Sequence, residues 1–182
     1  MVKTLIKNAI LTDAEYCPSA HYNERPDGAV VSLLVIHNIS LPPNEFGGEY
    51  IKYFFTGCLD PNLHPYFADI YQMRVSAHCL ITRDGRVVQF VPFDKRAWHA
   101  GASSFQGVKD CNDYSIGIEL EGTDHIPYTD AQYHSLIGLT KKLQTHYPEI
   151  NIAKIVGHND IAPGRKTDPG MAFDWSRYRQ MI

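Results

Sequence analysis

Residues 29–36 read Ala-Val-Val-Ser-Leu-Leu-Val-Ile, a nearly continuous apolar run that stops at His37 and Asn38. The run is short and rich in β-branched residues, which favours a strand over a helix. Because its apolar residues do not alternate with polar ones, we expect this strand to be buried on both faces. A strand of this kind requires further strands beside it and helices over the faces of the sheet.

Further strand patterns occupy four segments, Val75–Thr82, Val87–Val91, Tyr114–Glu121 and Ile152–Val156. The first two flank Arg83-Asp84-Gly85-Arg86, a tight-turn sequence that predicts a β-hairpin. The third segment alternates: Ile116, Ile118 and Leu120 share one face, and small or acidic residues share the other. We therefore expect a sheet of mixed direction that contains a hairpin and one strand with a polar face.

Helices are expected in three places. Thr129-Asp130-Ala131-Gln132 matches a capping box, and apolar residues follow it at helical spacing. Shorter helices are expected around Tyr50–Phe55 and from about Asp174 to the end of the chain. No repeat or linker-like stretch divides the sequence, which predicts a single α/β domain over residues 1–182, a mixed β-sheet flanked by helices on its faces. Residues 1–28 are polar and turn-rich, and we expect them to wrap around the body.

The composition limits the partners of the protein. Seventeen Lys and Arg against twenty Asp and Glu give a formal net charge of -3, which argues against a nucleic-acid binder. No apolar run approaches the roughly 20 residues that span a bilayer. The N-terminus also lacks the apolar core of a secretory signal, so a cytoplasmic protein with no membrane partner is expected, with its four cysteines reduced. A monomer is the default expectation, because no unexplained apolar stripe stands out.

Two histidines lie where predicted strands end. His37 follows the first apolar run, His158 follows the last short strand pattern, and Asp168 comes ten residues later in a polar loop. Ligands usually bind at strand ends in α/β sheets. Two imidazoles and one carboxylate would hold zinc and leave a fourth position for water. Spacing alone leaves the alternative open that both histidines only cap strands and bind the backbone.

Longer segments carry a resemblance to a known family. They are Val35–Ser40, Arg74–His78, Ala97–Gly101, Gly117–Gly122 and Gly157–Gly170. In this order, from about Pro18 to Trp175, the chain resembles the cytoplasmic 1,6-anhydro-N-acetylmuramyl-L-alanine amidases of the AmpD type. These form a branch of the zinc amidases and are related to peptidoglycan-recognition proteins. The resemblance implies hydrolysis of the amide between the lactyl group of 1,6-anhydro-N-acetylmuramic acid and L-alanine, in the recycling of peptidoglycan fragments.

The resemblance also assigns roles to individual residues. It implies Zn2+ held by His37, His158 and Asp168, with Glu119 as general base and Lys166 as the stabiliser of the oxyanion. These roles are chemically coherent, since a carboxylate can take a proton from water and pass it to a leaving amine. From the residues alone, Glu121 would serve as well as Glu119, and Lys166 would be an ordinary surface lysine.

Three further residues are candidate contacts for a muropeptide substrate. Asn38 and Arg74 could bind it, because the carboxylates of a stem peptide need a local cation or donor. His99 lies beside Trp98 and could line the cleft. The alternatives are an exposed charge for Arg74 and structural support for His99. The chain departs from some relatives at Asp110, where they have arginine, and that change leaves the preferred peptide open.

Other functions remain to be weighed. A non-catalytic module that binds peptidoglycan fragments is the main alternative, because relatives that lose a zinc ligand can survive as sensors; Asp168 and Lys166 favour catalysis. A glycosidase could use Glu119 and Glu121, although its carboxyls usually come from different elements. A nucleophilic Cys79 served by His78 is disfavoured, because neighbours in a strand point to opposite faces.

Overall fold

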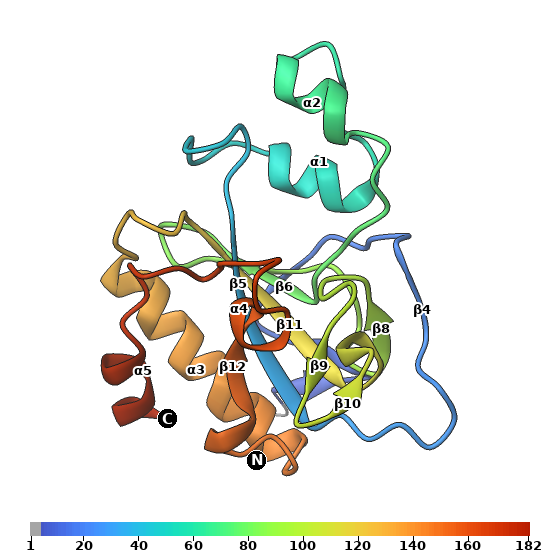
Figure 1. Ribbon diagram of the computed structural model, residues 1–182, viewed down its shortest axis with the longest axis vertical. Helices are drawn as coiled ribbons and strands as arrows, with labels where there is room; N and C mark the ends of the chain where they lie inside the picture. Colours follow the sequence, from blue (N-terminus) through green and yellow to red (C-terminus); the bar gives the residue numbers. More distant parts are fainter. Residues whose placement is uncertain (1–4) are drawn as a thin grey trace.

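The computed structural model describes residues 5–182, and its centre is a six-stranded mixed sheet (Figure 1). The strand order is β12-β5-β11-β6-β7-β3. The strands are β3 (Glu15–Tyr16), β5 (Leu33–Ile39), β6 (Cys79–Ile81), β7 (Val87–Gln89), β11 (Ser115–Glu121) and β12 (Ile155–Gly157). Four of the five pairings are parallel, and β6 pairs with β7 in antiparallel fashion, as the hairpin signal predicted. The predicted single α/β domain with a mixed sheet is confirmed.

Strand β5 is buried as predicted, but its limits differ from the apolar run. It begins at Leu33 and continues through His37 to Ile39, so the prediction that the strand ends at His37 was wrong. The reason is its pairing: β5 and β11 run in parallel register from Leu33 beside Ser115 to Ile39 beside Glu121. Backbone bonds to β11 thus extend the strand past the point where apolar side chains stop.

Strand β11 is buried on both faces, including its polar residues Ser115, Glu119 and Glu121. Its other face, with Ile116, Ile118 and Leu120, belongs to the main apolar core beneath helix α3. The expected polar face therefore exists, but it is enclosed rather than solvated. Enclosed carboxylates need partners or a function.

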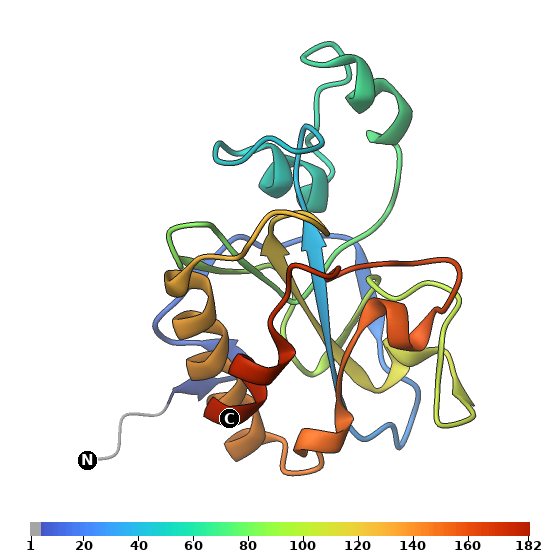
Figure 2. The ribbon, with the colours of Figure 1, turned by 60° about the vertical axis from the view of Figure 1, so that its left-hand side comes forward.

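The helices divide between the two sides of the sheet. They are α1 (Tyr50–Thr56), α2 (Pro65–Ile70), α3 (Asp130–His146), α4 (His158–Ile161) and α5 (Trp175–Met181). Helices α3 and α5 lie side by side along the sheet, while α1 and α2 stand beyond the end of β5 (Figure 2). The capping box at Thr129 is present, with Thr129 accepting from the Gln132 N–H and Gln132 from that of Thr129. The sequence patterns missed two of these helices, α2 and the single-turn α4.

Short strands and 3-10 turns complete the described part. They are β1 (Ile6–Lys7), β2 (Ile10–Leu11), β4 (Tyr22–Glu24), β8 (Lys95–Ala97), β9 (Ser104–Phe105), β10 (Val108–Lys109), η1 (Cys111–Asp113) and η2 (Ile152–Lys154). The N-terminal strands follow the periphery: β3 extends the sheet edge, and β4 pairs with β8. The short 3-10 turn η2 replaces the first half of the strand predicted at Ile152–Val156.

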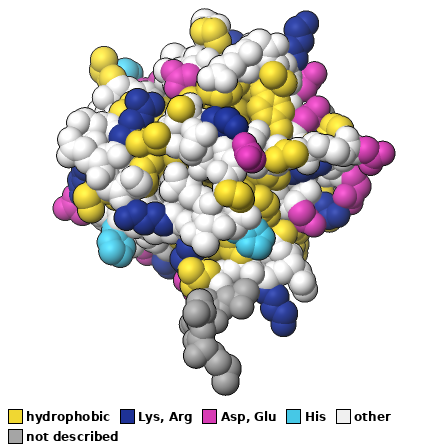
Figure 3. Space-filling view, turned by 90° about the horizontal axis from the view of Figure 1, so that it is seen from below, with side chains coloured by type: hydrophobic (Ala, Val, Ile, Leu, Met, Phe, Trp, Pro, Cys, Tyr) yellow, Lys and Arg dark blue, Asp and Glu magenta, His cyan; other side chains and the backbone are white. Residues whose placement is uncertain are grey.

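The described surface carries charges of both signs. Lysine, arginine and acidic side chains are interspersed on the face shown in Figure 3, in keeping with the small net charge of -3. Within residues 5–182 no helix combines the length and the apolar character that a membrane crossing demands.

Candidate metal centre

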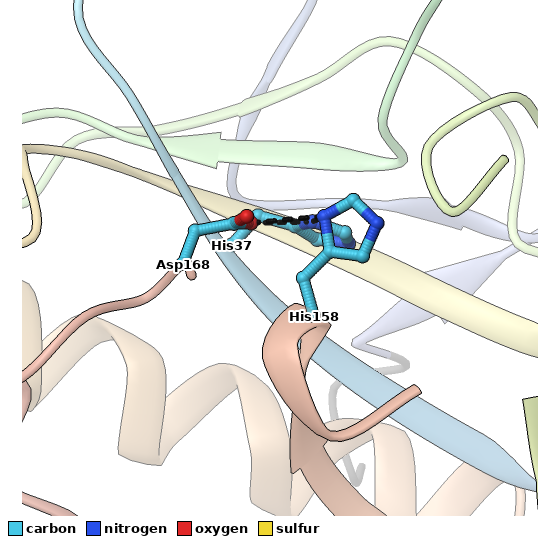
Figure 4. Close-up of side chains that lie close together, drawn as sticks. All are labelled: His37, His158 and Asp168. Atoms are coloured by element: carbon cyan, nitrogen blue, oxygen red, sulfur yellow. Dashed lines mark hydrogen bonds and ion pairs between the residues drawn. The ribbon is translucent and has the colours of Figure 1, made fainter. Parts of the chain in front are cut away.

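His37, His158 and Asp168 meet at one point beside the sheet (Figure 4). His37 Nδ1 and His158 Nδ1 lie 3.0 Å apart, and Asp168 Oδ2 lies 3.1 Å from the first and 3.0 Å from the second. His37 comes from β5, His158 from the first turn of α4, and Asp168 from the loop that follows. The structure thus brings together the three residues that the strand ends and the family resemblance suggested.

Local contacts explain why Asp168 returns to the two histidines. The Asn159 N–H donates to the Asp168 carbonyl oxygen over 3.0 Å, which ties the loop to the start of α4. The next carbonyl, that of Pro169, accepts from the Tyr128 hydroxyl over 2.8 Å and from Asn38 Nδ2 over 3.2 Å. The backbone on both sides of Asp168 is therefore held.

The outer contact of His158 indicates which of its ring nitrogens faces the centre with a lone pair. His158 Nε2 lies 3.1 Å from the Ala100 carbonyl, which can only accept, so this nitrogen carries a proton, and in the neutral ring the Nδ1 lone pair faces the centre. Burial lowers the pKa of His37 to about 4, so its imidazole is neutral at neutral pH.

This donor set fits a divalent metal. Two imidazole nitrogens and a carboxylate oxygen are ligands that zinc takes, and a fourth position stays open in catalytic sites of this composition. Ligands about 2.0–2.1 Å from a tetrahedral zinc ion lie roughly 3.3–3.4 Å apart. The observed separations of 3.0–3.1 Å are close to that spacing. Both histidines are buried, which fixes their rings in place.

Glu119 lies beside His37 on the neighbouring strand, in direct register. It is 8% exposed, and among the residues that the structure describes its Oε2 has no hydrogen-bond partner. Burial raises the pKa of Glu119 well above its ordinary value, the charge of Asp168 adds to this, and Lys166 opposes it. An unpaired carboxyl with a raised pKa next to a candidate metal centre is suited to accept a proton.

Glu121, two residues further along the same face, is in a different situation. Its Oε1 accepts from the Gly47 N–H and its Oε2 from the Arg83 N–H over 2.9 Å. Glu121 therefore ties two loops to the end of β11, and it does not line the cavity at the triad. The structure separates the two carboxylates that the sequence left equivalent, and it gives no support to a pair of glycosidase carboxyls.

The triad lies at the floor of a cavity of about 370 Å³. Helices α1 and α2 contribute an apolar wall to it through Phe54, Tyr66 and Ile70, and Trp98 adds to that wall from another loop. A polar cavity of about 500 Å³ adjoins the first, and both are lined by Asp168 and by the exposed Lys166. The triad thus borders the first cavity, and Asp168 also borders a second, more polar one.

The three predicted substrate contacts are placed differently. Asn38 lines both cavities, although its Nδ2 already donates to Asp124 Oδ1 over 2.8 Å as well as to Pro169. His99 lines the first cavity, and its Nδ1 lies 2.8 Å from His37 Nε2. Arg74 is exposed and is not among the residues that line either cavity.

Sequence reasoning missed the wall that α2 supplies. The signal was present, because His64 precedes Pro65 and caps the helix by accepting from the Tyr66 N–H. His78 has the structural role that its pattern suggested: its Nδ1 accepts from the Gly117 N–H over 3.0 Å. Cys79 is fully buried, and that burial raises the pKa of its thiol, which disfavours a cysteine nucleophile.

Comparison with known proteins identifies relatives over nearly the whole chain. The family model of the N-acetylmuramoyl-L-alanine amidases matches residues 23–171. The 1,6-anhydro-N-acetylmuramyl-L-alanine amidase AmpD of Citrobacter freundii is 61% identical over 98% of this chain and 95% of the relative.

Solved structures give the same picture. A crystal structure of a selenomethionine AmpD derivative matches with a TM-score of 0.95 and 61% identity, covering 98% of this chain and 99% of that one. The Escherichia coli amidase AmiD, solved in complex with its substrate anhydro-N-acetylmuramic acid-L-Ala-D-γ-Glu-L-Lys, matches with a TM-score of 0.61 and 31% identity, over 87% of this chain and 60% of that one.

Proposed function

This chain belongs to the N-acetylmuramoyl-L-alanine amidase family, and we propose that it hydrolyses the amide between the lactyl group of 1,6-anhydro-N-acetylmuramic acid and L-alanine in muropeptides. The observation that carries the proposal is the meeting of His37, His158 and Asp168 beside the unpaired carboxyl of Glu119. We place the reaction in the cytoplasmic recycling of wall fragments, on the resemblance to the AmpD branch.

We propose zinc as the metal and the triad as its ligands. Zinc bound there would polarise the substrate carbonyl and lower the pKa of water to about 7. His37 and His158 supply neutral imidazoles through Nδ1, and Asp168 supplies an anionic oxygen from the loop after α4. Two neutral ligands and one anionic ligand leave a net positive centre, which suits attack on an amide.

Glu119 is the general base in this proposal. Its Oε2 is buried and has no hydrogen-bond partner in the described part of the chain, so no hydrogen bond there must break before it accepts a proton. The raised pKa of Glu119 brings its proton affinity closer to that of the groups it must serve near neutral pH. After it takes a proton from the attacking water, the same carboxyl can donate that proton to the departing nitrogen of L-alanine.

In this proposal, Lys166 stabilises the negative oxygen of the tetrahedral intermediate. It lines both cavities at the rim of the triad, two residues before Asp168. Its ammonium is exposed, and among the described residues no salt bridge is found for it, which leaves its charge available to substrate. A preorganised cation at the developing oxyanion stabilises the transition state more than the ground state.

The two cavities give room for the two halves of the substrate. The amide at the triad has a sugar-bearing lactyl group on one side and a peptide on the other, and one cavity is partly apolar while the other is polar. A fragment-binding module without activity would not need the unpaired Glu119, whose burial costs stability. That carboxyl favours the enzyme over the binding module.

The test is release of peptide from an anhydromuramyl-tripeptide, followed by mass spectrometry. We expect cleavage by the zinc-loaded chain, none after zinc is stripped with a chelator, and recovery when zinc returns. Asp168→Ala should abolish cleavage even in excess zinc. Cleavage that survives stripping would refute the metal mechanism, and binding of the tripeptide without any cleavage would favour the fragment-binding module.

A further inference from the structure

The outer ring nitrogens of the two triad histidines contact two consecutive residues of the chain. On the side away from the centre, His37 Nε2 lies 2.8 Å from His99 Nδ1, and His158 Nε2 lies 3.1 Å from the Ala100 carbonyl oxygen. His37 and His158 are 121 residues apart in the chain. Their outer contacts nevertheless come from a single dipeptide, His99-Ala100, in the loop after β8.

This dipeptide is fixed by its own set of contacts. The Oδ1 of Asn112, a residue 6% exposed in η1, accepts from the His99 N–H over 3.1 Å and from the Ala100 N–H over 2.8 Å. The ring of His99 lies over Gly117 of β11, where an added Cβ would come within 2.5 Å of it. The position of the dipeptide is therefore fixed by the buried side-chain amide of Asn112 and by the space that Gly117 leaves for the His99 ring.

The contacts also determine where the protons lie. The Ala100 carbonyl can only accept, so His158 keeps its proton on Nε2 and directs the Nδ1 lone pair inward. If His37 uses Nδ1 in the same way, its Nε2–H donates to His99 Nδ1. His99 then carries its own proton on Nε2, which donates to Ser115 Oγ over 3.0 Å.

We propose that His99-Ala100, anchored by Asn112, is a positioning element that holds both imidazole ligands in the tautomer and orientation that a metal requires. This inference rests on the proposed function, because it takes the triad as the metal site. Partners of this kind commonly change metal affinity by about 10–100-fold. Both ring nitrogens of His99 are engaged with His37 and Ser115, so His99 acts through His37 and not as a substrate contact.

Two amide substitutions of His99 separate this role from simple packing. Asn places its side-chain oxygen near the position of the imidazole Nδ1, where it can still accept from His37. Gln reaches to the position of Nε2, on the side of Ser115. We expect His99→Gln to weaken Zn2+ binding by about 10–100-fold, measured by competition with a chromogenic chelator, and His99→Asn to bind Zn2+ nearly as tightly as the wild type.

A second pair tests the anchor and covers the case that a His99 variant fails to fold. Asn112→Asp keeps an acceptor for the two backbone N–H groups, whereas Asn112→Ala removes it. We expect zinc affinity to fall in Asn112→Ala and to be largely kept in Asn112→Asp. Thr140→Val is the matched control, because it deletes a buried hydrogen bond between Thr140 of α3 and Tyr178 of α5, outside the site, and should leave zinc affinity unchanged.

The NMR signals of the imidazole ring protons give a measurement that does not depend on the overall stability of the fold. In zinc-loaded wild type, the His37 Nε2 proton should appear in NMR as a protected, downfield ring proton, and it should be lost in His99→Gln. Equal zinc affinity in wild type, His99→Asn and His99→Gln would overturn the inference, as would an Asn variant as weak as the Gln variant. If instead the wild type binds no zinc, or Asp168→Ala binds it equally well, the proposed function itself fails.

Discussion

At the scale of single residues, two carboxylates on one strand face have opposite environments. Glu121 accepts two backbone N–H bonds, from Gly47 and Arg83, and so behaves as a structural anion. Glu119 is also buried, yet within residues 5–182 its Oε2 has no hydrogen-bond partner. An unpaired buried polar group costs about 1–3 kcal/mol of stability. A fold that keeps such a group next to a metal centre sacrifices stability for reactivity.

Replacing Glu119 by Gln should therefore lower activity and raise stability. We expect cleavage to fall by about 10²–10⁴-fold through loss of the general base. Burial raises the pKa of Glu119 in the folded chain above the ordinary value of 4.5, so the carboxyl lowers stability as the pH rises from about 4.5 through the raised pKa. The metal-free Gln variant should be more stable than wild type at neutral pH, by about 1–3 kcal/mol in urea unfolding, and the gain should vanish below about pH 4.5.

Glu121→Gln is the control on the same strand face. It replaces an acceptor of two N–H groups by an amide that presents its own N–H₂ to one of them, so it should lower stability at neutral pH. A Glu119→Gln chain less stable than the wild type at neutral pH would contradict the account of Glu119.

Lys166→Met should slow the reaction and leave the fold intact. The ammonium is exposed and lines the cavities, so its removal should lower kcat by about 10²–10³-fold and leave the unfolding midpoint and zinc affinity unchanged. Steady-state kinetics on the anhydromuramyl-tripeptide, beside a chelator competition for zinc, measures both. If Lys166→Met weakened zinc binding and left kcat unchanged, the residue would support the metal site and would not stabilise the oxyanion.

At the scale of elements, helix α3 shows what one cap contributes. Thr129 Oγ1 accepts from the Gln132 N–H over 3.1 Å and donates to the Arg83 carbonyl over 2.7 Å, so it joins the helix to the turn of the β6–β7 hairpin. Thr129→Ala should cost about 1–2 kcal/mol in urea unfolding, and Thr129→Ser much less, because Ser keeps the hydroxyl. Activity per folded molecule should not change in either variant. If Thr129→Ala left the free energy of unfolding unchanged, the cap would add no stability beyond that from the burial of α3.

Elements with a local signal could be predicted from the sequence. The capping box predicted where helix α3 begins, and the Arg83–Arg86 turn predicted the hairpin. The end of β5 could not be predicted, because His37 and Ile39 are held in the strand by their pairing with β11, a segment about 80 residues away. Contacts between distant segments carry no signal within a short window of sequence.

The same distinction between local signals and contacts between distant segments applies to the residues of the site. The triad could be proposed because His37 and His158 follow predicted strands and Asp168 lies in a predicted polar loop, and the structure brings the three together. The difference between Glu119 and Glu121 depends on loop N–H groups at Gly47 and Arg83, which no spacing rule supplies. The partnership of His99 with His37 likewise depends on the fold.

At the scale of the whole molecule, burial of neutral histidines should make the metal-free chain sensitive to acid. Burial lowers the pKa of His78 to about 3, and the charge of nearby Arg25 adds to the effect. The unfolded chain takes up this proton at about pH 6.5. The stability that His78 contributes is therefore complete above pH 6.5 and is lost as the pH falls toward 3, at about 1.4 kcal/mol per pH unit.

Urea unfolding of metal-free His78→Gln at several pH values tests this. The variant should be less stable than wild type at pH 7, because Gly117 and Lys95 lose a partner, but its stability should fall less steeply between pH 6.5 and 4. His146→Gln, a substitution at an exposed histidine, should keep the wild-type slope. An unchanged slope in His78→Gln would show that other groups cause the acid sensitivity.

The metal centre should also stabilise the molecule as a whole, because its ligands come from β5, from α4 and from the loop that ends at Asp168. An ion that binds only the folded chain adds RT ln(1 + [Zn]/Kd), about 2.7 kcal/mol at a hundred times Kd. The thermal midpoint of wild type should therefore rise with buffered free Zn2+, and that of Asp168→Ala should not. Glu119→Gln should respond like wild type, since a base that is not a ligand leaves metal binding intact. If the thermal midpoint did not change with zinc although cleavage required zinc, the ion would bind through the substrate rather than through the triad.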